Sequence, residues 1–287
     1  MCGFFFLVVF FSVSLYGKES IILRSKPHGM FSMFHFVLYY LQEYERGTID
    51  GLKVDFAKTG LYYEESAGLN WWEYYFEPII LENQNAWNSI TIIEEDTYVD
   101  PNCIEFSNSL EDNHHLVEKY IKIKRQILQK IDDFQKENFE DKFVIGVHYR
   151  GTDKVHYEAP SVAYSNVMES IYKVIDQIPE GMGYKIFIAT DELPFLQFMQ
   201  CQFLSKVFYC KIKRSTDGVP LHLDSERAPY QVGEDALIDA VLLSRVNFLI
   251  RTSSNLSLCS RYFNPQLPVI ELSQRRQETI PCTEFYP

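Results

Sequence analysis

The chain has 287 residues, 46% of them hydrophobic, and a formal net charge of −12 at pH 7. This apolar content is typical of a folded globular protein with a sizeable core and excludes an intrinsically disordered chain. The acidic balance argues against nucleic acid as a partner, because a phosphate backbone demands a basic surface. A small phosphorylated ligand remains compatible with it, since such a ligand needs only a local positive pocket.

The N-terminus begins with a short apolar segment. Residues 4–13 are almost wholly apolar, but a segment of about a dozen residues is shorter than the ~20 that span a bilayer. Residues 1–17 are typical of a secretory signal peptide or short membrane anchor, which predicts a protein of the secretory pathway, the periplasm or a membrane surface. A buried first strand is the alternative, because no Lys or Arg precedes the apolar residues.

The first half of the chain shows the hydrophobic pattern of an α/β domain. A strand is expected at 21–23, a turn with Gly29 follows, and apolar side chains at helical spacing predict a helix over 31–44. A second strand is expected at 52–56, and an amphipathic pattern predicts one long helix over 112–138. A strand, a Gly-containing loop and a helix in this order open a nucleotide-binding domain.

The second half alternates more regularly between strands and helices. Strands are expected at 143–147, 185–189, 206–210, 247–250 and 268–272, and helices at 162–178, 193–204, 234–243 and 254–262. Such alternation requires right-handed crossovers and builds a parallel sheet with helices on both faces. We therefore predict two α/β domains, residues 18–140 and 141–287, of which the second is Rossmann-like.

Polar clusters follow three of these strands. They occupy residues 148–154, 190–192 and 251–255, the last where a helix begins. The carboxyl ends of parallel strands meet at one edge of a sheet, where ligands bind. An arginine there can hold a phosphate through two hydrogen bonds, and a helix N-terminus offers further donors. Helix capping by Ser253 or Ser254 would explain the third cluster alone, but not the convergence of all three.

These clusters resemble the α-1,6-fucosyltransferase family and its wider fucosyltransferase-like relatives. The resemblance is carried by His-Tyr-Arg-Gly-Thr-Asp-Lys-Val at 148–155 with Glu158, by Ile-Ala-Thr-Asp-Glu at 188–192, and by Ile-Asp-Ala-Val-Leu-Leu-Ser at 238–244 before the Thr-Ser-Ser turn at 252–254. It implies the GT-B architecture, in which two Rossmann-like domains face each other across a cleft. It also implies an inverting transfer of fucose from GDP-fucose to a glycan acceptor, without a metal ion or other cofactor.

The resemblance implies a role for each residue of the clusters. His148 and Asp239 would bind the guanine and ribose end of the donor, and Arg150 would hold the β-phosphate as GDP leaves. Glu158 would remove the proton from the acceptor hydroxyl, and Lys154 would orient it. Further candidates for donor binding are Gly29, Ser253, Ser254 and Asn255. Asp153 and Asp191 complete the set, although the simpler interpretation of Asp191 is a cap of the following helix.

Some features leave alternatives open. Close relatives place a second arginine where this chain has Gly151, so a non-catalytic nucleotide-sugar or carbohydrate-binding protein, or a transferase for another nucleotide sugar, is also compatible with the sequence. The six cysteines contain no Cys-x-x-Cys pair, which argues against a zinc site and allows either one or two disulfides or buried thiols. Aromatic residues between 61 and 80 are expected mostly in the core, with one or two facing an acceptor sugar.

Overall fold

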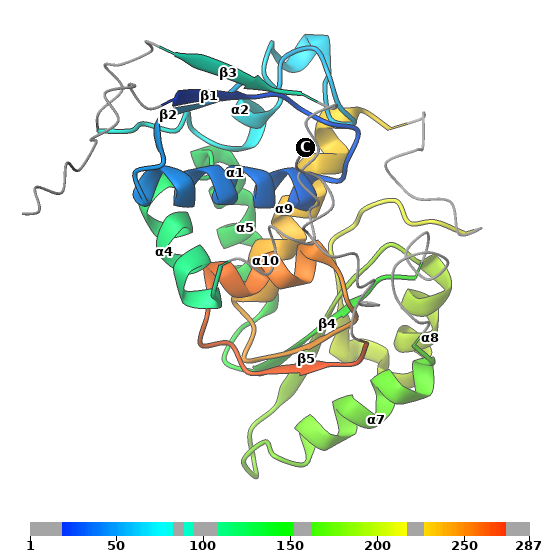
Figure 1. The fold of residues 1–287 in the computed structure, drawn as a ribbon. Coiled ribbons are helices and arrows are strands. Elements are labelled where there is room, and N and C mark those ends of the chain that lie inside the picture. Colours follow the sequence, from blue (N-terminus) through cyan, green and yellow to red (C-terminus); the bar gives the residue numbers. More distant parts are fainter. Residues whose placement is uncertain (1–18, 83–88, 95–107, 152–161, 217–226, 274–287) are drawn as a thin grey trace, which may run out of the picture.

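Two parallel β-sheets form the frame of the molecule (Figure 1). The computed structural model describes residues 19–82, 89–94, 108–151, 162–216 and 227–273. The first sheet has three strands in the order β2-β1-β3, and the second has five in the order β6-β5-β4-β7-β8. The predicted α/β class with a parallel sheet in the second half is therefore confirmed.

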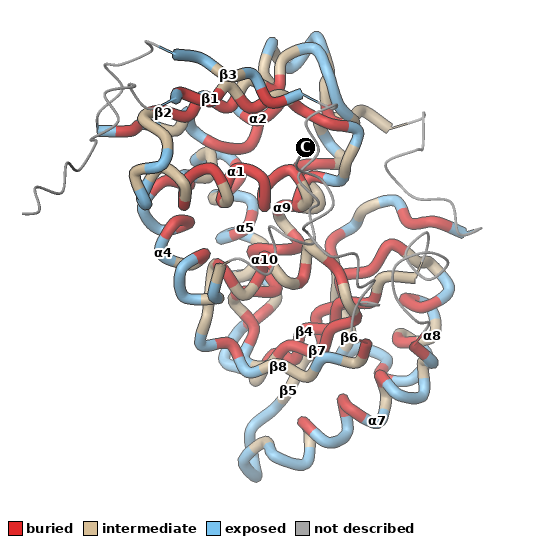
Figure 2. The backbone as a smooth tube through the Cα atoms, in the orientation of Figure 1, coloured by how far each residue is buried: buried red, intermediate tan, exposed pale blue. Residues whose placement is uncertain are grey.

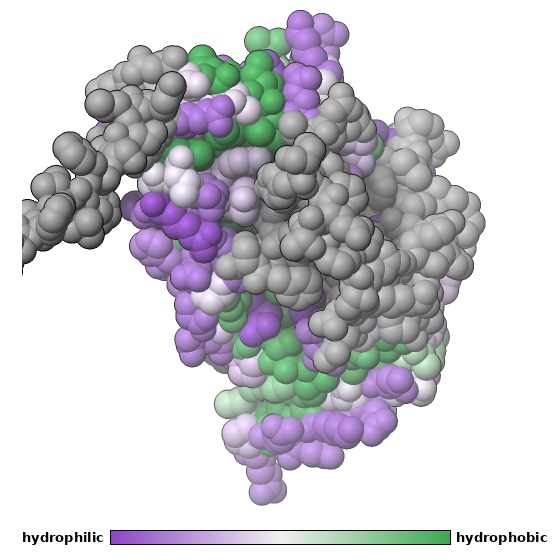
Figure 3. Space-filling model, in the orientation of Figure 1, coloured by the Kyte–Doolittle hydropathy of each residue, from purple (hydrophilic) through white to green (hydrophobic). Residues whose placement is uncertain are grey.

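The first sheet is built from β1 (Glu19–Leu23), β2 (Ile49–Val54) and β3 (Ile90–Ile93), with α1 (Met30–Glu45) crossing between β1 and β2. α1 is buried along most of its length because it lies between this sheet and helices from both halves of the chain (Figure 2). A short 3-10 helix (Glu65–Ala67) and α2 (Trp72–Tyr75) follow. The sequence did not predict β3, an edge strand whose Ile90 and Ile92 are half-exposed. Apolar residues gather on the surface over this sheet (Figure 3).

The prediction of a single helix over 112–138 is wrong. The structure has α4 (Leu110–Tyr120) and α5 (Arg125–Asn138), separated by extended backbone at Ile121. The intervening residues pair with the end of α2: the Glu77 N–H donates to the Lys122 carbonyl at 2.7 Å, and the Lys124 N–H donates to the Tyr75 carbonyl at 2.8 Å. Tertiary hydrogen bonds thus replace helical ones at the break, and no pattern of apolar residues within 112–138 reveals them.

The second sheet is built from β4 (Phe143–Tyr149), β5 (Tyr184–Thr190), β6 (Val207–Phe208), β7 (Phe248–Arg251) and β8 (Val269–Glu271). Its helices are α7 (Tyr164–Ile175), α8 (Leu193–Phe203), α9 (Pro229–Ser244) and α10 (Asn255–Phe263), and a 3-10 turn (Leu204–Lys206) follows α8. β4 lies at the centre, with β5 and β7 paired to it in parallel on either side.

The two faces of this sheet carry different apolar cores. Ile145, Val147 and Ile188 pack on one face with residues of α7 and α8. Val144 and Phe187 on the other face belong to a larger core that continues through α5, α9 and α10 to α1 and the first sheet. This shared core fixes the two sheets relative to each other (Figure 2). The division into domains at 140/141 stays a prediction.

The predicted signal or anchor, residues 1–17, lies outside the described residues. Among the helices that the structure does describe, none combines the length and the apolar character needed to cross a membrane.

Candidate functional site

The ends of β4, β5 and β7 meet at one edge of the second sheet. His148 pairs in register with Ala189 of β5 and Arg251 of β7. Beyond the strands, the Thr252 N–H donates to the His148 carbonyl at 3.0 Å, and the Arg150 N–H donates to Thr252 Oγ1 at 2.9 Å. The predicted clusters at 148–154, 190–192 and 251–255 therefore converge as far as their residues are described: strand pairing and these hydrogen bonds hold the ends of the three strands together.

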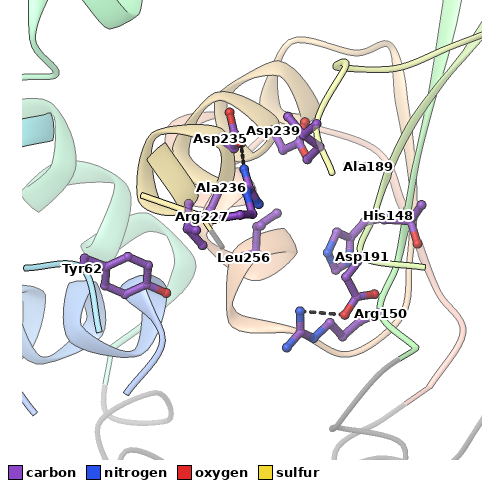
Figure 4. A pocket seen from close by; sticks show the side chains of 13 residues that line it. Tyr62, His148, Arg150, Ala189, Asp191, Arg227, Asp235, Ala236, Asp239 and Leu256 are labelled. Carbon is purple, nitrogen blue, oxygen red and sulfur yellow. Dashed lines mark hydrogen bonds and ion pairs between the residues drawn. The ribbon is translucent and has the colours of Figure 1, made fainter. Parts of the chain in front are cut away.

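A pocket opens above this edge (Figure 4). Its empty space, with the open mouth and the solvent there included, is about 600 Å³. Its walls come from the ends of β4 and β5, the loop after β6, the helices α9 and α10, and the first half of the chain through one tyrosine. The lining residues are Tyr62, His148, Arg150, Ala189, Thr190, Asp191, Ile212, Arg227, Val232, Asp235, Ala236, Asp239 and Leu256.

The Arg150 guanidinium lies in the pocket and is held by Asp191. Arg150 Nη1 is 2.7 Å from Asp191 Oδ2, and the other carboxylate oxygen accepts the Gly151 N–H at 3.1 Å. Asp191 does not cap α8, whose N-cap is Glu192 without a side-chain hydrogen bond. The capping interpretation of Asp191 is therefore corrected: its buried carboxylate fixes the direction of Arg150 instead.

Gly151 is the position where the sequence departs from the family. A Cβ atom built there would lie 2.0 Å from Glu192 Oε1, so the Glu192 carboxylate occupies the space of a side chain. The Tyr164 hydroxyl donates to Glu192 Oε2 at 3.0 Å, and burial raises the pKa of this carboxyl group. Any larger residue at 151 requires Glu192 to move.

Asp239 brings a buried carboxylate to the pocket from α9. Within the described part of the chain, no group donates a hydrogen bond to its Oδ1 atom. Burial raises the pKa of Asp239 to about 7, and the nearby charge of Arg214 and the Cys210 thiol act in the opposite direction. An unsatisfied buried acceptor costs free energy unless a ligand supplies the donor, so Asp239 is suited to bind N–H groups of a ligand.

Tyr62 brings the first half of the chain to the same pocket. Its hydroxyl accepts the Met30 N–H at 2.9 Å and thereby joins the pocket wall to the N-terminus of α1. Burial raises the pKa of Tyr62, while the positive charge of Arg150 lowers it. Gly29, the N-cap of α1, lies next to the Tyr62 hydroxyl and is not itself part of the lining.

Ser253, Ser254 and Asn255 lie beside the pocket rather than in its lining, and the next residue, Leu256, lines it. The Ser253 N–H donates to Ser273 Oγ at 2.9 Å, and Ser254 is the N-cap of α10 without a side-chain cap hydrogen bond. The serine hydroxyl groups therefore do not cap α10 in the structure. Their carbonyl and amide groups fix the turn between β7 and α10.

Three of the predicted site residues, Asp153, Lys154 and Glu158, lie outside the described residues. No group of three or more His, Cys, Asp or Glu side chains with the arrangement of metal ligands occurs in the part of the chain that the structure describes.

The sequence did not predict a second ion pair in the pocket. An Arg227 Nη2 atom contacts Asp235 Oδ2, and both residues line the pocket. Burial raises the pKa of Asp235, while Arg227 acts in the opposite direction. Asp235 could have been found from the sequence, because it precedes Asp239 by four residues and so lies on the same face of the predicted helix. Arg227 precedes that helix, and no motif marks it.

The two parallel sheets, with a pocket at the carboxyl edge of the second, define an α/β protein of the GT-B type. The solved structures that share this fold include a NodZ α-1,6-fucosyltransferase soaked with GDP-fucose, with a TM-score of 0.61, 20% identity, and coverage of 88% of this chain and 95% of that one. The fucosyltransferase NodZ from Bradyrhizobium matches with a TM-score of 0.57 and 18% identity over 90% of this chain and 98% of that one. A mutant of Arabidopsis thaliana FUT1 in complex with GDP matches with a TM-score of 0.55 and 9% identity over 90% of this chain and 71% of that one.

The sequence itself assigns the family. The model of the family Nodulation protein Z (NodZ) matches residues 87–276, more than half of the chain. The chain therefore belongs to the NodZ family, which confirms the resemblance drawn from the three motifs. A search of curated protein sequences found no significant match.

Proposed function

We propose that this protein is an inverting glycosyltransferase that transfers fucose from GDP-fucose to a hydroxyl group of a glycan acceptor, without a metal ion. The observation that carries this proposal is that Arg150 and Asp239 line one pocket, although one follows β4 and the other lies in α9. A cation and a buried acceptor on opposite walls suit the two ends of a nucleoside diphosphate. Membership of the NodZ family supports the same substrate class.

The base end of the donor is assigned to Asp239 and His148. Guanine presents two neighbouring donors, N1–H and the 2-amino group, and an ionised carboxylate accepts both. Asp239 has an Oδ1 atom with no donor among the described residues, which favours this pairing. His148 enters the same pocket from the end of β4 (Figure 4) and suits the ribose or the other edge of the base.

The diphosphate end is assigned to Arg150. Its guanidinium is held by Asp191 at 2.7 Å, so the arginine enters the reaction already oriented. As the bond between C1 of fucose and the β-phosphate oxygen breaks, the leaving GDP gains negative charge, and a preorganised arginine stabilises that charge. Arg227 adds a second cation to the lining.

The acceptor side is assigned to Glu158 and Lys154, which lie outside the described residues. The acceptor oxygen forms a bond to C1 from the face opposite the departing phosphate, and its proton passes to the Glu158 carboxylate. Lys154 orients this carboxylate and keeps it ionised.

Calorimetric titration with GDP tests the donor assignment. We expect binding by the wild type and a loss of about 10- to 100-fold in affinity for Arg150→Ala, the cost of a charged hydrogen-bond partner of a phosphate. The exposed Arg46→Ala variant serves as a matched control that should keep wild-type affinity. No binding at millimolar GDP, or equal binding by Arg150→Ala, would overturn the proposal.

A non-catalytic nucleotide-sugar binding protein is the second candidate. It is favoured by Gly151, because Glu192 fills the space that an arginine side chain would need. Release of GDP from GDP-fucose with a panel of glycan acceptors distinguishes the two: an enzyme shows turnover that Glu158→Gln abolishes. Binding without turnover on any acceptor supports the second candidate. Competition by UDP or ADP in place of GDP would instead indicate another nucleotide sugar.

We further propose that residues 1–17 direct the protein to the secretory pathway, the periplasm or a membrane surface. N-terminal sequencing of the purified protein checks this. A chain that begins near residue 18 supports a cleaved signal, whereas a soluble chain that retains Met1 contradicts both a signal and an anchor.

A further inference from the structure

Arg227 is a buried cation in the wall of the pocket. It lies two residues before α9, and its side chain is only 9% exposed. Its Nη2 atom donates a hydrogen bond to Asp235 Oδ2. Within the part of the chain that the structure describes, Asp235 is the only residue that hydrogen-bonds with the Arg227 side chain. Because a guanidinium group carries five N–H donors, this single contact leaves donors for a ligand in the pocket.

The position of the ion pair on α9 relates it to the base end of the donor. Asp235 and Asp239 are four residues apart and both line the pocket, so they share one face of the helix with a rise of about 6 Å between them. Asp235 is the nearer of the two to the N-terminal end of α9. This end packs on the first half of the chain, where the Tyr75 hydroxyl donates to the Tyr230 carbonyl at 2.8 Å. A nucleotide whose base contacts Asp239 and whose other end extends toward the first half therefore passes Arg227.

The charges of the lining residues favour a second cation for a diphosphate. The carboxyl groups of Asp191, Asp235 and Asp239 line the pocket together with the guanidinium groups of Arg150 and Arg227. Each arginine is paired with a carboxylate of its own, as the dashed lines of Figure 4 mark. Since Asp191 already offsets the charge of Arg150, a ligand with negative charge on both of its phosphates is stabilised further by a second guanidinium group.

We propose that Arg227 is a second donor-binding cation, which contacts the diphosphate of the nucleotide sugar together with Arg150, and that Asp235 is the positioning residue that fixes the direction of its guanidinium group. This inference rests on the proposed function, because it takes a guanine nucleotide as the ligand. Gly151 contributes no side chain beside Arg150, and Glu192 fills the space there. The second guanidinium group of the pocket therefore comes from the segment before α9 instead.

Competition of GDP, GMP and guanosine against a fluorescent GDP analogue tests the inference on the full chain. Arg227→Ala should weaken GDP binding by about 10- to 100-fold, the cost of a charged hydrogen-bond partner of a phosphate. It should leave the affinity for guanosine unchanged, because guanosine has no phosphate. Arg227→Lys keeps the charge and should recover part of the loss. Arg245→Ala is the matched control: it removes an ion pair with Asp132 at the other end of α9 and should bind like the wild type.

A double variant separates the loss of the cation from the exposure of its partner. Arg227→Ala leaves the Asp235 carboxylate without its partner, and this carboxylate repels a phosphate. Arg227→Ala/Asp235→Asn removes that repulsion and should bind GDP more tightly than the single variant, but still about tenfold more weakly than the wild type. If the double variant regains full affinity, Arg227 only neutralises Asp235 and the proposal is overturned.

Asp235→Ala tests the positioning role by the sign of its effect. Removal of a carboxylate that merely cancels positive charge would strengthen GDP binding. Removal of a carboxylate that orients the guanidinium group should weaken it, with the affinity for guanosine unchanged. Asp235→Asn keeps an acceptor oxygen and should stay nearer to the wild type. Tighter binding of GDP by Asp235→Ala would overturn the positioning role.

The remaining outcomes separate this inference from the proposed function. No binding of GDP by the wild type contradicts the proposed function itself. Equal losses for GDP and guanosine in Arg227→Ala place this arginine at the base and overturn the inference alone. An equal loss for GDP and GMP assigns the contact to the phosphate next to the ribose, and a loss for GDP only assigns it to the terminal phosphate; both support the inference. Thermal unfolding confirms that each variant is folded, and Arg227→Gln, which keeps most of the length of the side chain, replaces Arg227→Ala if that variant does not fold.

Discussion

The backbone N–H of Arg150 donates a hydrogen bond to the Thr252 hydroxyl at 2.9 Å, and this contact joins the end of β4 to the end of β7. Thr252 is buried, so the hydroxyl has little competition from water. The Thr252 N–H in turn donates to the His148 carbonyl at 3.0 Å. These bonds extend the pairing of the two strands into the site and fix the backbone from which Arg150 reaches the pocket.

Thr252→Val tests this contact, because valine keeps the shape and removes the acceptor. A buried N–H left without a partner costs about 1–3 kcal/mol, so we expect the free energy of unfolding in urea to fall by that amount. GDP affinity should fall with it, since the Arg150 backbone loses its anchor. Thr252→Ser restores an acceptor and should behave like the wild type. Equal stability of Thr252→Val and the wild type would show that the bond has no structural role.

Gly151 and Glu192 should behave as a coupled pair. A Cβ atom at 151 meets Glu192 Oε1 at 2.0 Å, so Gly151→Ala forces the Glu192 carboxylate to move; we expect a loss of about 0.5–1.5 kcal/mol, the net contribution of its hydrogen bond with Tyr164. In a Glu192→Ala background the clash is gone, and the same substitution should cost less. The double-mutant cycle, measured by urea unfolding, gives the coupling free energy. Additive effects of the two substitutions would contradict the close contact.

Gly233 controls how closely α9 approaches the first half of the chain. A Cβ atom there would lie 2.2 Å from Tyr75 Oη and 2.7 Å from Met30 Cε. Because Tyr75 is fully buried and its hydroxyl donates to the Tyr230 carbonyl at 2.8 Å, it has little room to move. We expect Gly233→Ala to cost roughly 1–3 kcal/mol of stability and to weaken GDP binding, since α9 also carries Asp239. Gln231→Ala, on the exposed side of the same helix, is the control that should leave both measurements unchanged.

Asp239 should lower the stability of the free protein at neutral pH, which separates its functional role from a structural one. Its pKa is raised from 3.8 to about 7, so between these values the native state holds a proton that the unfolded state has released. The linkage relation then requires the stability of the wild type to fall as pH rises through this window.

Unfolding of wild type and Asp239→Asn in urea at pH 4 and pH 8 measures this effect. As pH rises from 4 to 8, the free energy of unfolding of the wild type should fall relative to that of Asp239→Asn by a few kcal/mol, about 4 at most. The same substitution should weaken GDP binding. A stability difference that does not change with pH would show that the pKa of Asp239 is not raised in the folded state.

The second half of the chain was predictable from sequence because its strands are short apolar runs between polar turns, and its helices have regular spacing. The single helix predicted over 112–138 was wrong, because its break depends on backbone hydrogen bonds that Lys124 and Lys122 form with Tyr75 and Glu77, which lie far away in the sequence. The convergence of Arg150 and Asp191 at one edge followed from parallel topology alone. Tyr62 and Arg227 enter the pocket from segments without a strand-end motif, so only the packing of the two halves reveals them.

A structure of the protein with GDP bound tests the central claim most directly. The account predicts the guanine edge against Asp239, the β-phosphate within hydrogen-bonding distance of the Arg150 guanidinium, and the nucleotide lying between them in the pocket of Figure 4. A nucleotide bound elsewhere on the molecule, or a base and diphosphate that contact neither residue, would contradict it.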